Sequence, residues 1–69
     1  MYYMQVKNNL KKIRMQEYLM APGEFAKFLE VDIKNYSSWE RGRSKPTLDK
    51  ALKIAEKLNK DVKEIWYLE

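Results

Sequence analysis

Apolar and polar positions along this chain repeat with the period of an α-helix, and no stretch alternates with the period of two that is typical of a strand. Near the N-terminus, Val6, Leu10 and Ile13 share one helical face, which predicts a helix over about residues 5–17. A clearer stripe follows in the second half of the chain, at Leu48, Ala51, Leu52, Ala55 and Leu58.

Two shorter helices are predicted between these stripes. The first is expected over about residues 22–29, because Pro22 suits the first helical position, where a missing N–H costs nothing. The second is expected over about residues 33–41, with Asp32 as its N-cap and Gly42 as its left-handed C-cap. A helix of about eight residues is too short to persist alone, so each must pack against the rest of the chain. The expected core side chains of this pair are Phe25, Ala26, Phe28, Leu29, Val31, Tyr36 and Trp39.

The end of the chain predicts one more short helix. Thr47 is expected to cap the helix that carries the stripe from Leu48 to Leu58, and Asn59 is expected to end it. Asp61 with Glu64 then forms a capping-box pattern. Val62, Ile65, Trp66 and Leu68 are expected to close the core. The 69 residues therefore predict a single compact all-α domain, residues 1–69, of four or five helices.

Composition makes several classes of protein improbable. The chain has no His, no Cys and only two Gly, which argues against His-based catalysis, thiolate metal sites and glycine-rich phosphate loops. We therefore expect no enzyme activity, no metal and no cofactor. No apolar run approaches the roughly 20 residues of a membrane span, and the N-terminus lacks the apolar block of a signal peptide. We expect a cytoplasmic protein without a membrane partner.

Positive charge is unevenly distributed. Residues 33–53 carry six basic and two acidic residues, whereas residues 21–32 carry one basic and three acidic. A basic face of this kind suits a polyanion such as DNA. The same distribution also fits a lysine-rich surface that only faces water.

The chain from about Asn8 to Tyr67 resembles the phage-repressor and Cro-type helix-turn-helix family, often called the XRE family. The resemblance rests on LKKIR, then EFAKFLEVDIKNYSSWERGRSKPTL, then ALKIAEKLN and DVKEIW. The segment WERG-x-x-x-P, from Trp39 to Pro46, is among its more specific signatures. The resemblance implies a lambda-repressor-like fold and sequence-specific binding of double-stranded DNA.

The resemblance also implies roles for individual residues. Base contacts would come from the start of the second short helix, at Ile33, Lys34, Ser37 and Ser38. Phosphate contacts would come from the side chains of Asn35, Arg41, Arg43 and Lys45, and from the backbone N–H groups of Ala21, Gly23 and Glu24. A partly buried ion pair between Arg14 and Glu40 would hold the first helix against the end of the second short helix, which would be the recognition helix.

Several residues depart from the family pattern. Ala21 and Pro22 stand where Ser or Thr and then Gln are common, so no side chain is available there to bind a phosphate. Glu30 stands at the turn glycine, which implies either a negative φ or a strained residue. Asp32 and Ile33 stand where polar or basic residues usually meet DNA. These departures bear on the base contacts more than on DNA binding.

Two functions follow as hypotheses. The first is a small transcriptional regulator, a repressor that occupies a palindromic operator, with a weak homodimer through Trp66, Tyr67 and Leu68. The second is a protein-interaction module that keeps the fold, such as an antitoxin or antirepressor partner. Glu30, Asp32 and Ile33 favour the second.

Overall fold

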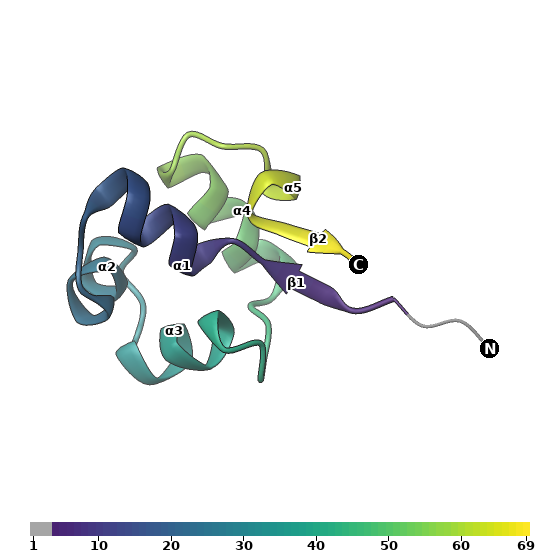
Figure 1. The fold of residues 1–69 in the computed structure, drawn as a ribbon, viewed down its shortest axis with the longest axis horizontal. Helices are drawn as coiled ribbons and strands as arrows, with labels where there is room; N and C mark the ends of the chain where they lie inside the picture. The colour runs from purple at the N-terminus through teal and green to yellow at the C-terminus, as the bar shows by residue number, and fades with distance from the viewer. Residues whose placement is uncertain (1–3) are drawn as a thin grey trace.

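The structure, a computed structural model, describes residues 4–69. Figure 1 shows helices making up most of the molecule, with two short strands side by side near the C-terminus. The predicted all-α helix-turn-helix fold is confirmed. Its elements in chain order are β1 (Val6–Asn8), α1 (Leu10–Ile13), the π-helix η1 (Arg14–Tyr18), α2 (Pro22–Phe28), α3 (Ile33–Glu40), α4 (Leu48–Lys57), α5 (Val62–Ile65) and β2 (Trp66–Leu68).

The two strands correct the predicted first helix, which begins at Leu10 and not near Gln5. β1 and β2 pair antiparallel with Lys7 opposite Tyr67, and Gln5 and Glu69 exchange two further backbone hydrogen bonds. Asn8 ends β1, and its Oδ1 accepts a hydrogen bond of 3.1 Å from the N–H of Leu10. That bond satisfies a donor in the first turn of α1, so the helix begins there.

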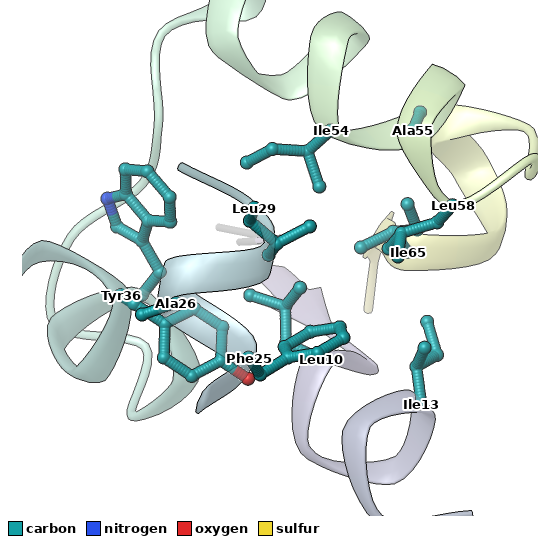
Figure 2. Close-up of a cluster of buried hydrophobic side chains, with 11 residues drawn as sticks. Leu10, Ile13, Phe25, Ala26, Leu29, Tyr36, Ile54, Ala55, Leu58 and Ile65 are labelled. Atoms are coloured by element: carbon teal, nitrogen blue, oxygen red, sulfur yellow. The ribbon is translucent and has the colours of Figure 1, made fainter. Parts of the chain in front are cut away.

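The core lies between helices α1 to α5, where Leu10, Phe25, Leu29, Ile54 and Ile65 converge (Figure 2). Each of these side chains is at most 5% exposed. Burial of this apolar surface is the main stabilising contribution in a chain without disulfides.

Part of the predicted core is wrong. Leu48 is 71% exposed and Leu52 is 50% exposed, whereas Ile54, which the predicted stripe omits, is buried. The inner face of α4 therefore runs through Ala51, Ile54, Ala55 and Leu58, so Ile54 takes the place that the prediction gave to Leu48 and Leu52. The prediction that Leu68 lies in the core is also wrong, because Leu68 at the end of β2 is 59% exposed.

Among residues 4–69, four residues outside the regular helices have positive φ angles. Gly42 at 77° and Asn59 at 56° confirm the predicted left-handed helix ends. Glu30 has φ of 61°, so the strained alternative holds at the turn between α2 and α3. Leu19, which ends η1, has φ of 53° and was not predicted.

Replacing Leu19 with asparagine is expected to stabilise the protein by about 0.5–1 kcal/mol. The left-handed conformation costs a residue such as leucine roughly 1–2 kcal/mol, and asparagine tolerates it better. The Leu19 side chain is 84% exposed, so little packing is lost. Thermal unfolding followed by circular dichroism should show a melting temperature a few degrees higher.

Glu30→Asn is the matched control for Leu19→Asn. It relieves the same backbone conformation, but it also removes the 3.3 Å ion pair between Glu30 and Lys57. Its gain should therefore be the smaller of the two. A melting temperature unchanged or lowered by Leu19→Asn would contradict the strain argument.

Candidate nucleic-acid interface

Helices α2 and α3 form a closely packed pair. The rings of Phe25 and Tyr36 meet edge to face at 5.6 Å, and Ala26 lies almost fully buried beside them. The N–H of Val31 donates to the carbonyl of Ala26 at 2.9 Å, which closes the turn between the helices. The small side chain at Ala26 allows this close approach. The pair is therefore a rigid unit that presents the outer face of α3.

The outer face of α3 is polar and basic. Asp32 caps the helix by accepting a 2.7 Å hydrogen bond from the N–H of Lys34. Tyr36 and Trp39 turn inward, which leaves the opposite side of the helix at the surface. A shallow groove of about 370 Å³ lies there, lined by Ile33, Lys34, Ser37, Ser38, Arg41 and Arg43.

That groove brings together the four residues expected to contact bases and two of those expected to contact phosphates. Lys45 lies further along the loop and is exposed. Asn35 is also exposed, but it does not line the groove.

The loop after α3 is fastened to that helix. The hydroxyl of Ser44 donates to the hydroxyl of Ser38 at 2.8 Å, and the N–H of Arg43 donates to the carbonyl of Ser38 at 2.9 Å. These bonds position Arg43 at the end of the groove. They also give Ser38 a structural partner that sequence reasoning missed, because its hydroxyl accepts one hydrogen bond from Ser44.

The N-terminus of α2 differs from the expectation. The carboxylate of Glu24 accepts a 2.9 Å hydrogen bond from the N–H of Ala21. The Ala21 N–H therefore already has an acceptor within the chain, and its contact with a phosphate stays a prediction. Gly23 and Glu24 lie in the first turn, where N–H groups lack helical partners, but the carboxylate beside them opposes an anion.

Arg14 and Glu40 form a two-pronged ion pair beneath the recognition helix. Arg14 Nε lies 3.0 Å from Glu40 Oε2 and Nη2 lies 3.2 Å from Oε1, with the side chains 9% and 15% exposed. Arg14 Nη1 also donates to the carbonyl of Met20 at 2.9 Å. The pair thus connects η1 and the chain before α2 to the end of α3.

Tyr36 completes this cluster, a contact that sequence reasoning missed although Tyr36 and Glu40 lie one helical turn apart. Its hydroxyl donates to Glu40 Oε2. Burial by itself would raise the pKa of the Glu40 carboxyl, but the hydrogen bonds from Arg14 and Tyr36 hold that pKa below its ordinary value of 4.5. Glu40 is therefore ionised at neutral pH.

Other kinds of site find little support in residues 4–69. These residues contain no cluster of three or more His, Cys, Asp or Glu side chains placed to hold a metal ion. Nor does any helix in this part of the chain have the length and apolar character to cross a membrane. The groove on α3 and the basic loop beside it have the chemistry that suits a polyanion.

A tight helix pair that presents a polar, basic helix face defines a DNA-binding domain of the helix-turn-helix class. The family model described as "Helix-turn-helix" matches residues 10–65, which is most of the chain. The chain belongs to this family, of the Cro and phage-repressor type. It is a DNA-binding protein of the transcription-regulator type. No curated protein matches the chain at a significant level.

Proposed function

We propose that the protein is a sequence-specific, cytoplasmic repressor that acts by occupying an operator overlapping a promoter. The observation that carries this proposal is the groove on the outer face of α3, which groups polar, apolar and cationic side chains on one exposed helix surface. A helix with such a face fits the major groove, where base edges offer hydrogen-bond acceptors and thymine methyl groups. No bound effector is needed for this mechanism.

Within this proposal, the groove residues divide into two roles. Lys34 donates to the O6 and N7 atoms of a guanine, Ile33 contacts a thymine methyl group, and Ser37 adds a further polar contact. Arg41, Arg43 and Lys45 bind backbone phosphates and set the position of α3 on the duplex. Ser38 holds the loop by accepting from Ser44, and its O–H can still donate to a base edge.

We also propose a weak homodimer on a palindromic operator. In the antiparallel ladder, Gln5 and Glu69 form a hydrogen-bonded pair, so the backbone groups of Leu68 point to the free edge of β2. Leu68 and Trp66 share one face of the strand, and the exposed Leu48 lies on α4 in the groove that Trp66 also lines. Tyr67 takes the opposite face, so the dimer proposal rests on Trp66 and Leu68.

A second candidate function is a protein-interaction module. The observation that favours it is the negative charge around the two helix starts, from Glu24 at α2 and Asp32 at α3. These carboxylates lie where phosphates would approach. A basic partner protein would find them attractive.

Selection of bound duplexes from a random pool, followed by a salt series, tests the proposed function. We expect a palindromic sequence with half-sites about 34 Å apart, because two symmetry-related α3 helices must enter successive major grooves. The logarithm of the binding constant should fall with the logarithm of salt concentration, with a slope of about −0.9 for each phosphate contacted. A flat salt series with no selected sequence would contradict it and favour the interaction module.

A further inference from the structure

A second hollow lies beside the recognition surface, between the β1–β2 pair and the end of α3. Its volume is about 690 Å³. The side chains that matter for its chemistry are Lys7 from β1, Arg41 at the end of α3, Lys45 from the following loop and Tyr67 from β2.

The hollow is positively charged. Lys7, Arg41 and Lys45 contribute three cations to its lining. Among the described residues that line it, Glu40 is the one acid, and both of its carboxylate oxygens already accept hydrogen bonds from Arg14. The remaining field therefore favours an anion. Lys7 and Tyr67 are directly opposite in the ladder, so their side chains lie on the same face, where the phenol hydroxyl can add a donor.

The strand that carries Lys7 is held in place against the recognition helix. Asn8 Nδ2 donates to the carbonyl of Trp39 in α3 at 2.8 Å. The next residue, Asn9, donates from its side chain to the carbonyl of Glu64 at 3.0 Å and from its backbone to that of Ile65 at 2.8 Å. The backbone of Lys7 is thus held beside α3 before any ligand arrives, so only the lysine side chain must be ordered on binding.

Arg41 connects the hollow to the DNA-facing groove, because its side chain lines both. We infer that the hollow binds a backbone phosphate of the duplex just outside the half-site, with Lys7 as a phosphate ligand alongside Arg41 and Lys45. This inference rests on the proposed DNA binding and extends its footprint from the helix-turn-helix to the β1–β2 pair. The occupant is a phosphodiester of the bound DNA, because a DNA strand lying over Arg41 continues from the groove on α3 into the hollow.

Lys7→Ala tests this assignment, with Lys63→Ala on α5 as the matched control. Lys63 is also an exposed lysine, and it lines neither the groove nor the hollow. On the selected operator with flanking sequence, Lys7→Ala should weaken binding about fivefold to tenfold at roughly 0.1 M salt and reduce the salt slope by about 0.9. Lys63→Ala should behave as wild type, and both variants should keep the wild-type melting temperature.

Modified duplexes then locate the phosphate. Trimming the flank, or placing an uncharged methylphosphonate at the one contacted position, should weaken the wild type as much as Lys7→Ala does and should not weaken that variant further. Equal salt slopes for wild type and Lys7→Ala would overturn the inference while leaving the proposed function intact. A wild-type protein with no salt-dependent DNA binding would overturn both. If inorganic phosphate titrates the hollow of the free protein while Lys7→Ala leaves DNA binding unchanged, the hollow holds a free anion and the inference is wrong.

Discussion

Replacing Glu40 with glutamine is expected to lower the free energy of unfolding by about 3 kcal/mol, because it leaves the Arg14 guanidinium nearly buried without its counter-charge. The hydrogen bond from the Tyr36 hydroxyl is also weakened, since its acceptor loses its charge. For a domain of this size the melting temperature should fall by roughly 12–24 °C. Thermal unfolding at pH 7 measures this loss directly.

Three comparisons separate this effect from a general loss of charge. Asp49→Asn breaks the exposed pair between Asp49 and Lys53 and should change the unfolding free energy by less than about 1 kcal/mol. Replacing Arg14 and Glu40 together with methionine should cost less than removing either alone, because no buried charge is left unpaired.

The third comparison uses pH. The folded-state pKa of Glu40 is lowered, so its stabilising contribution is present above the ordinary pKa of 4.5 and is lost as the pH falls through the folded-state pKa. The difference between wild type and Glu40→Gln should therefore narrow below pH 4.5. An unchanged melting temperature for Glu40→Gln at pH 7 would contradict the stabilising role of the pair.

Local rules account for the parts of the fold that the sequence predicted well. Asp32, Thr47 and Asp61 each accept a hydrogen bond from an N–H two or three residues later, and each begins a helix. Such caps depend on a few neighbouring residues, so they can be recognised without knowing the rest of the structure. The same holds for Gly42 and Asn59 at the helix ends.

The β1–β2 pair could not be predicted in this way. Each strand has three residues, and the partners Asn8 and Trp66 lie at opposite ends of the chain. A strand that short shows no alternation, and its pairing depends on how the helices bring the two ends together. The prediction for the inner face of α4 was wrong for a related reason. Leu48 and Ile54 both fit the helical period, and only packing against the neighbouring helices determines which of them is buried.

In the candidate interface, too, the sequence predicts what depends on local spacing and misses what depends on tertiary contacts. The residues of the α3 groove share a helical phase, so the sequence grouped them correctly without knowing their surroundings. What it missed depends on contacts across a turn or between distant segments: the bond between Ser44 and Ser38, the bond between Ala21 and Glu24, and the position of Lys7 beside Arg41. The tertiary fold therefore gives the Ala21 N–H and the Ser38 hydroxyl partners within the chain, and it brings Lys7 to the binding surface.

Lys34→Ala and Arg43→Ala are expected to weaken DNA binding in two distinguishable ways. Lys34 lies on the exposed turn at the start of α3, so its loss should relax the preference at one base pair by about 1–3 kcal/mol and change other positions little. Arg43 lies on the loop at the end of the groove, so its loss should weaken all duplexes alike and reduce the salt slope by about 0.9. Binding to a set of singly substituted operators at several salt concentrations measures both effects.

The distinction depends on position and not on charge, since both variants remove one cation from the same groove. Lys63→Ala again supplies the control for the loss of a cation elsewhere, and unchanged melting temperatures show that neither variant acts through folding. If Arg43→Ala relaxed one base pair and Lys34→Ala weakened all sequences alike, the loop would enter the major groove and the start of α3 would lie on the backbone. The duplex would then cross α3 in the opposite sense, and the carboxylate of Asp32 would lie among the phosphates.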